Sequence, residues 1–168
     1  MRLPLASLLV PLLLSACQRP APAEPAAAAE APAPRAAPAA EPLPPLLALR
    51  LAQEAEARPT GTPRAEEVLA ALQRAGLHLG EHQQYLASAS GARYCYGARS
   101  QRGLRLSVCE YGDVASARAA RQRVLRALGS PERAVLLNRA TTLQLQRPVG
   151  SPDAEAEART AAQAFQKL

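Results

Sequence analysis

The sequence predicts an α+β domain over residues 61–168, a two-layer sandwich in which helices lie on one face of an antiparallel sheet. Three observations predict this fold class. Apolar residues recur at helical spacing at the start, middle and end of the region. Residues 92–111 alternate around a short loop, as in a hairpin, and two further short strands meet at Asn138-Arg139. The predicted order is therefore helix, weak strand, hairpin, helix, hairpin, helix.

The first helix of this region is predicted to begin with Thr62 as N-cap and Pro63 at the first helical position. Gly76 is suited to end it. Between them, apolar residues at helical spacing form the expected buried stripe: Val68, Leu69, Leu72 and Ala75. After a polar stretch, residues 85–87 are expected to form a weak strand that leads into a turn at residues 88–91.

The hairpin is the most informative part of the sequence. The loop Gln101-Arg102-Gly103 suits a type I turn followed by a left-handed glycine and a bulge. Centring the register on this loop places Cys95 opposite Cys109 at a non-hydrogen-bonded pair, where side chains approach most closely. The alternation assigns the core face to five residues and the cysteines to the other: Tyr94, Tyr96, Leu104, Leu106 and Val108.

Cys95 and Cys109 are an even pair in a chain that we expect to be exported, so we expect a structural disulfide between them. The alternatives are a redox-active pair and two free thiols. A redox pair is less favoured because redox cysteines generally lie close in sequence at a helix N-terminus, whereas these lie in the middle of strands.

Three more elements complete the domain. A helix is predicted from an Asp113 N-cap to Gly129, with Val114, Ala117, Val124, Leu125 and Leu128 as its apolar stripe. Residues 134–137 and 141–146 are predicted strands. The last helix is predicted to start at Ser151-Pro152-Asp153 and to bury Ala158, Ala161, Phe165 and Leu168.

The charge is basic, with a formal net charge of +6. Residues 61–168 account for all of this excess, because they hold fourteen Arg and one Lys against nine acids. No acid lies among residues 114–128, so four arginines of that helix are a possible contact for anionic surfaces such as envelope polymers: Arg118, Arg121, Arg123 and Arg126. The alternative is an ordinary solvated surface.

The N-terminal part is expected to be processed and extended. Residues 1–16 have a basic start, an apolar run and small residues at the end, as in a secretory signal peptide. Residues 17–60 are rich in Ala and Pro, which favours an extended tether. A short helix is possible at residues 45–57, either as part of the domain or as a separate docking segment.

The motif Leu14-Ser15-Ala16-Cys17 resembles the lipobox of bacterial lipoproteins, and the resemblance covers residues 1–17 only. It implies that Cys17 becomes the N-terminus and carries two or three acyl chains, from diacylglycerol and a fatty acid such as palmitate. That number of chains anchors a protein stably. Gln18 implies sorting to the outer membrane, facing the periplasm, rather than to the inner membrane. The alternatives are an ordinary secreted protein and a membrane-spanning helix, which this interrupted run is too short to form.

The sequence reveals no specific activity. His78, Glu81 and His82 match the H-x-x-E-H pattern of zinc proteases, but Gly80 argues against the helix that the motif needs. No serine nucleophile motif or phosphate loop occurs, so we expect no cofactor and no enzyme activity. Tyr94 and Tyr96 are expected to face inward, which argues against nucleic-acid binding. We therefore expect a lipid-anchored, non-catalytic binding or structural module that contacts an envelope protein or anionic polymer. The alternatives are a small zinc-dependent hydrolase that uses His78, Glu81 and His82, and a module that docks electrostatically onto anionic envelope polymers.

Overall fold

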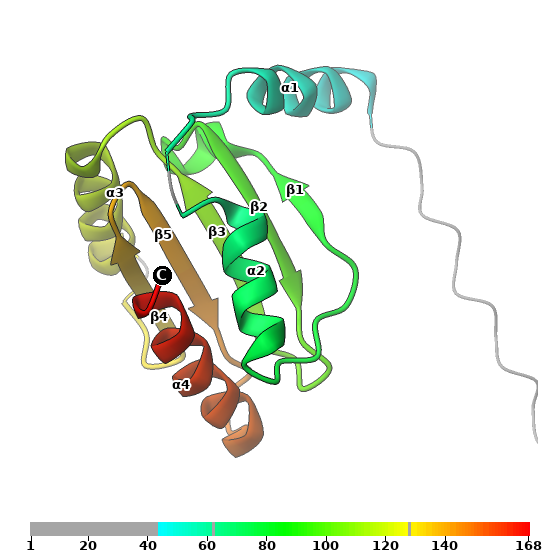
Figure 1. Cartoon of the computed structure of the whole chain (residues 1–168), viewed down its shortest axis with the longest axis vertical. Helices are drawn as coiled ribbons and strands as arrows, with labels where there is room; N and C mark the ends of the chain where they lie inside the picture. The colour runs from blue at the N-terminus through cyan, green and yellow to red at the C-terminus, as the bar shows by residue number, and fades with distance from the viewer. Residues whose placement is uncertain (1–43, 62, 128) are drawn as a thin grey trace, which may run out of the picture. The chain divides into compact units, whose positions relative to one another are not determined.

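A computed structural model describes residues 44–61, 63–127 and 129–168 (Figure 1). The predicted signal peptide, Cys17, Thr62 and Leu128 lie outside the described residues. The compact unit that holds the described residues runs from Glu41 to Leu168. Its elements are α1 (Pro45–Glu56), α2 (Ala65–Arg74), β1 (Gln83–Tyr85), the 3₁₀ helix η1 (Ala87–Ser90), β2 (Tyr94–Arg99), β3 (Arg105–Glu110), α3 (Val114–Ala127), β4 (Arg133–Asn138), β5 (Thr141–Gln146) and α4 (Pro152–Gln166).

The five strands form one antiparallel sheet in the order β1-β2-β3-β5-β4. The predicted register of the central hairpin is confirmed, because Cys95 pairs with Cys109 and Tyr96 with Val108. Gly103 has a φ of 87°, the left-handed conformation that the loop requires. The strands predicted at 134–137 and 141–146 are also confirmed, and their turn places Arg139 at a φ of 51°.

The larger core lies between the sheet and the helices α2 and α4, which lie side by side on one face (Figure 1). The predicted core residues Tyr94, Leu104, Leu106 and Val108 are buried here, and Tyr96 packs against them. The predicted stripes of α2 and α4 supply most of the opposing surface, namely Val68, Leu69, Leu72, Ala161 and Phe165. The predicted α+β fold class, with helices packed against an antiparallel sheet, is therefore confirmed.

The placement of every helix on one face is wrong, because α3 packs on the opposite face. Ala117 and Ala120 of α3 form a second buried cluster with Cys95 and Cys109. The disulfide makes this face apolar as well, and small alanine side chains let the helix approach it closely. The domain therefore has three layers, with the sheet in the middle.

The apolar stripe predicted for α3 is only partly correct. Ala117 is buried and Val124 is half-buried, but Val114 and Leu125 are 44% and 41% exposed. The predicted cap is confirmed, since the Asp113 carboxylate accepts the backbone N–H of Ser116 at 2.7 Å. The helix buries its alanines because the face beneath it already contains the two sulfur atoms and has room only for small side chains.

The start of α2 also differs from the prediction. The helix begins at Ala65, so Pro63 lies before it and not at its first position. The reason is a buried carboxylate on β3: Glu110 accepts the N–H of Ala65 at 2.6 Å. Arg58 donates to the same carboxylate from the segment before the helix, at 2.8 Å and 2.5 Å. A side chain remote in sequence therefore fixes where α2 starts.

The edge near β1 is held by α1. The predicted strand at 85–87 lies slightly earlier, at Gln83–Tyr85, and residues 87–90 form η1 instead. The buried Glu54 carboxylate of α1 accepts the N–H groups of Ala87 and Ser88 at 2.7 and 3.1 Å. These bonds satisfy the free donors at the start of η1, so α1 belongs to the domain.

Candidate functional site

The side of the sheet that carries α3 is only partly covered. A groove of about 290 Å³ lies over the half of this face that ends at the β2–β3 turn. Its walls include Val124 of α3 and Tyr85 of β1. This is near the lower limit for pockets that hold small ligands, so the groove would accommodate a small group or one segment of a larger ligand.

Three arginines lie in one row across this groove. Arg99 of β2 pairs directly with Arg105 of β3, Arg105 pairs with Gln146 of β5, and Gln146 pairs with Arg133 of β4. Neighbouring strands lie about 4.8 Å apart, so the row spans on the order of 14 Å. All four residues line the groove.

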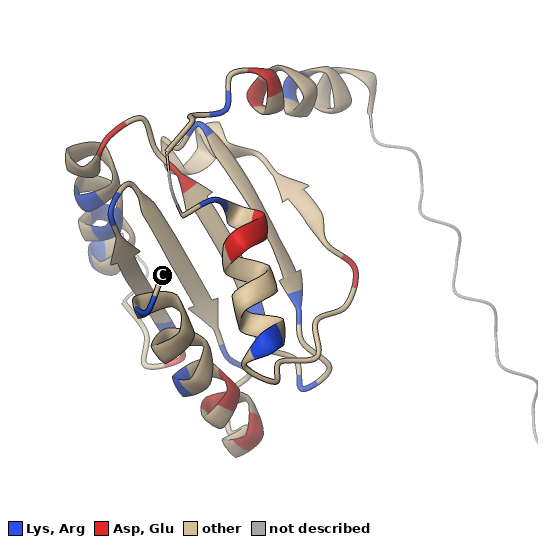
Figure 2. Cartoon of the chain, viewed as in Figure 1, with Lys and Arg blue, Asp and Glu red and all other residues tan. Residues whose placement is uncertain are grey.

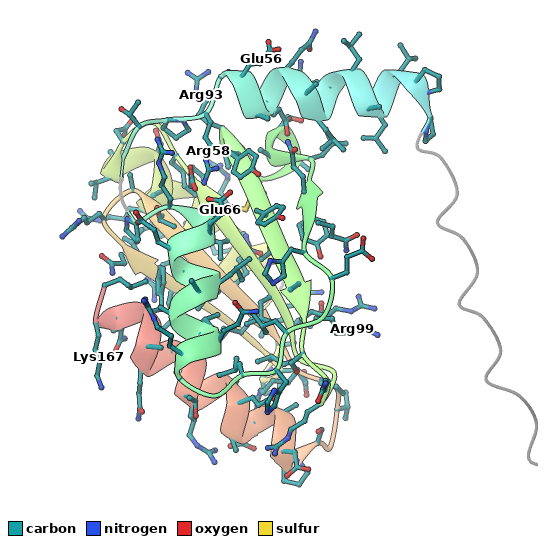
Figure 3. The ribbon with its side chains drawn as sticks, turned by 45° about the vertical axis from the view of Figure 1, so that its right-hand side comes forward. Glu56, Arg58, Glu66, Arg93, Arg99 and Lys167 are labelled. Atoms are coloured by element: carbon teal, nitrogen blue, oxygen red, sulfur yellow. A yellow bond between two sulfur atoms is a disulfide. The ribbon has the colours of Figure 1, made fainter. Side chains whose placement is uncertain are left out.

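The row carries positive charge that the described part of the domain does not neutralise. No acidic residue lines the groove, and Arg99, Arg105 and Arg133 form no ion pair with any described residue. In Figure 2 the ends of β2 and β3 beside their connecting turn carry basic residues. Figure 3 shows Arg99 extending outward from the end of β2. Because like charges directly opposite each other destabilise a sheet, the row costs stability unless an anion binds there.

Next to the arginines, the groove presents uncharged polar groups. Gln144 and Ser107 occupy the next row toward the disulfide, and Gln83 is paired with Gly97 in that row. The Gln144 and Gln146 amides make no hydrogen bond to any described residue, so both remain able to bind a ligand. The Gln83 amide donates to the Tyr85 hydroxyl at 2.8 Å.

A glycine shapes the floor of the groove. A Cβ atom on Gly97 would lie 2.1 Å from the Leu106 carbonyl oxygen and 2.9 Å from the Tyr85 ring. No side chain fits at this position, so the ring lies directly over the backbone of β2. The groove therefore combines a row of cations, a row of amides and an apolar surface made by Tyr85, Val124 and Val135.

The basic surface continues past the edge of the groove. An adjoining open hollow shares Arg133 and Gln146 with the groove and adds Arg126 and Arg147. Arg147 is partly neutralised by Glu155, at 3.3 Å, and Glu132 also lines this hollow. In this hollow, unlike in the groove, acidic residues therefore offset part of the positive charge.

The four arginines predicted on α3 do not act as one set. Arg121 donates from Nε to the Val135 carbonyl at 2.8 Å and so fastens α3 to β4. Arg123 donates to the Ser90 carbonyl at 3.3 Å. Arg118 is exposed and Arg126 lies at the adjoining hollow. Two of the four therefore hold the helix in place, and Arg126 contributes its charge to the hollow beside the groove.

The predicted cysteine pair forms a disulfide, with the two Cα atoms 4.2 Å apart. It lies beneath α3, in the row beyond Ser107 and Gln144, where both residues are 2% exposed. The disulfide therefore lies in the half of this face that α3 covers, and it borders the half that stays open.

The possible zinc ligands are not assembled. His78, Glu81 and His82 lie in the segment between α2 and β1, which is not helical, and the described residues contain no group of three that could hold a metal ion. His82 instead packs edge-on against Tyr96, with ring centroids 5.9 Å apart. Because this segment is not helical, the spacing of the motif does not bring its two histidines and its glutamate onto one face.

Sequence reasoning missed the groove arginines, although one signal was present. The alternation of the hairpin places Arg99 and Arg105 on the same face as the cysteines, and the register places them opposite each other. Arg133 gave no such signal, because it precedes the strand predicted at 134–137. Arg133 comes into one row with Arg105 only because β3 pairs with β5, and this pairing joins residues far apart in sequence.

Comparison with protein-family models, with curated proteins and with solved structures finds no significant match for this chain. The class that the fold and the groove define is a three-layer α+β domain with an arginine-lined groove on a half-covered sheet face. None of its described helices has the length and apolar character needed to cross a bilayer.

Proposed function

We propose that this protein is a lipid-anchored lipoprotein of the bacterial cell envelope whose α+β domain is a non-catalytic binding module. The groove is the binding surface, and its occupant is anionic. The observation that carries this proposal is the row formed by Arg99, Arg105 and Arg133, which lines a groove to which no acidic residue of the described part of the chain contributes.

The groove supports a binding role because its charge is unfavourable for the free domain. Arg99 and Arg105 lie directly opposite each other, and such a pair destabilises a sheet. A bound carboxylate or phosphate reverses this effect, since its hydrogen bonds to guanidinium groups are charge-assisted and about twice as strong as neutral ones. The arrangement is therefore suited to binding an anion.

The sequence supports the location. The lipobox-like motif that ends at Cys17 and the Ala/Pro-rich stretch after it are typical of a tethered lipoprotein. In this proposal the acyl chains on Cys17 hold the protein to the outer membrane, and the domain faces the periplasm. The disulfide between Cys95 and Cys109 agrees with an oxidising compartment.

Two measurements test this proposal. The mass of the mature protein purified from cells should correspond to a chain that begins at Cys17 and carries two or three acyl chains. A mature protein that retains residues 1–16, or that begins without lipid, would contradict the anchor.

The binding surface is tested by photo-crosslinking in intact cells. A crosslinker placed at Gln144, inside the groove, should form an adduct that is lost in the variant R99Q/R105Q/R133Q. A crosslinker at Gln73, on the exposed surface of α2, is the matched control and should not form that adduct. An adduct at Gln73 alone, or none at either position, would show that the groove is not the binding surface.

A further inference from the structure

We infer that the occupant of the groove is an acidic polysaccharide, a chain of sugars that carry carboxylates. This inference rests on the proposed function, since it names the ligand of the same groove. It follows from three chemistries that the groove presents together.

The first is the row of guanidinium groups. Arg99, Arg105 and Arg133 are spread over on the order of 14 Å, which is longer than a single sugar ring. Guanidinium forks match carboxylates in a bidentate geometry. A linear chain with repeated carboxylates can contact all three groups, whereas a single small anion cannot.

The second is the row of amides and hydroxyls. Gln144, Gln146 and Ser107 lie on the groove wall beside the arginines. The two glutamine amides are without hydrogen-bond partners among the described residues. Amides both donate and accept, as sugar hydroxyls do, so each can form paired hydrogen bonds with a sugar ring. An inorganic polyphosphate has no hydroxyl groups along its chain and would leave these amides with less to bind.

The third is the apolar surface beside the polar rows. The Tyr85 ring lies over Gly97, and Val124 and Val135 lie nearby. Sugar rings have apolar C–H faces that pack on aromatic and aliphatic side chains. The groove is also open along the row, because the adjoining hollow continues it from Arg133 to Arg126. An extended chain can therefore enter and leave at this end, which a closed pocket would prevent.

The test uses the full-length protein in detergent and a fluorescently labelled hexagalacturonate as the probe. Three comparison ligands separate the possible sources of binding. Fully methyl-esterified hexagalacturonate keeps the sugars but lacks the charge, monogalacturonate has one carboxylate, and polyphosphate of six units keeps the charge but lacks the sugars. Anisotropy at low and at physiological salt gives the dissociation constants.

We expect saturable binding of hexagalacturonate that is at least about tenfold tighter than binding of each comparison ligand. The variant R99Q/R105Q/R133Q should lose about tenfold or more in affinity, since the loss of even one hydrogen bond to a charged group weakens binding by about that factor. The control R74Q/R93Q/R118Q removes the same charge from exposed arginines outside the groove and should stay within about twofold. Higher salt should weaken binding by the wild type.

Three results would overturn the inference. Equal losses in the two triple variants would place the binding outside the groove. Polyphosphate that binds as tightly as hexagalacturonate would show general attraction of polyanions. If the methyl ester binds as tightly as hexagalacturonate, the carboxylates are not recognised and the arginines do not determine binding. This comparison needs no variant of the protein. If hexagalacturonate does not bind while the Gln144 adduct still forms in cells, the polysaccharide is excluded and the proposed function stands; if both are absent, both fail.

Discussion

Arg99 and Arg105 lie directly opposite each other on neighbouring strands, on the face of the sheet that α3 leaves partly open. Neither forms an ion pair with a residue in the described part of the chain. Two like charges in this position lower the stability of the hairpin, so the fold itself does not explain the pair.

This relationship predicts that removing either charge stabilises the protein. Arg99→Gln and Arg105→Gln should each raise the free energy of unfolding by roughly 0.2–1 kcal/mol, measured by urea denaturation. The double variant should gain less than the sum, because either substitution alone already removes the repulsion. Strictly additive effects, or a loss of stability in both single variants, would show that the two charges do not repel each other.

Gly97 should tolerate no side chain. Gly97→Ala places a Cβ atom against the Leu106 carbonyl and the Tyr85 ring, so the strand must shift. We expect a loss of about 1–3 kcal/mol in the free energy of unfolding, as for other overpacked sites. Gly112→Ala is the matched control, because no atom lies within 4 Å of its Cβ position, and it should have little effect. Equal effects of the two substitutions would contradict the close approach at Gly97.

The disulfide should stabilise the protein mainly by restricting the conformations of the unfolded chain. Cys95→Ala/Cys109→Ala should lower the free energy of unfolding by about 3 kcal/mol, the chain-entropy value for a loop of this length. Reduced wild-type protein should lose a similar amount, which serves as an independent check. Alkylation of Cys95 or Cys109 in the folded, untreated protein would be incompatible with the bond.

Arg58 should be important for stability at neutral pH. It bonds to Glu66, which lies beside it in Figure 3. It also bonds to the buried Glu110 and lies 4.1 Å from the centre of the Tyr94 ring. Arg58→Gln leaves the Glu110 carboxylate buried without its cation, so we expect a loss of roughly 3 kcal/mol. Arg74→Gln, an exposed position, is the control and should change stability by less than about 0.5 kcal/mol. A loss as small as the control's would show that the contact is not formed in solution.

The same contact predicts a dependence on pH. The hydrogen bond from Arg58 holds the pKa of Glu66 below its ordinary value of 4.5. A carboxyl group whose pKa is depressed in the folded state stabilises the protein above its ordinary pKa, and this contribution is lost as the pH falls through the folded value. The difference in unfolding free energy between wild type and Arg58→Gln should therefore be full at pH 7 and shrink below pH 4.5. A difference that stays constant down to pH 3 would contradict this linkage.

The hairpin could be predicted because everything that defines it is local. Period-two alternation, a three-residue loop ending in Gly103 and two facing cysteines lie within one short stretch. The position of α3 could not be predicted, because Ala117 and Ala120 are small and Val114 and Leu125 gave a stronger apolar signal. Which face a helix covers depends on the apolar surface waiting for it, here the disulfide.

The site was less predictable than the fold for a related reason. The four arginines of α3 stood out because no acid lies near them in sequence, yet Arg121 and Arg123 bind backbone carbonyls. The arginines that line the groove come from three strands, and only the pairing of β5 with β3 on one side and with β4 on the other brings Arg133 into their row. Contacts between residues distant in sequence therefore decide which arginines are available to a ligand.

The most direct test of the central claim is a titration of the ¹⁵N-labelled full-length protein with hexagalacturonate, followed by backbone NMR shifts. The account predicts that the shifts are largest at Arg99, Arg105, Gln146 and Arg133, with Val124 and Gln144 next. The residues of α2 and α4 should remain unchanged. Shifts confined to the outer face of α3 around Arg118, or spread evenly over all exposed arginines, would contradict the groove as the binding site.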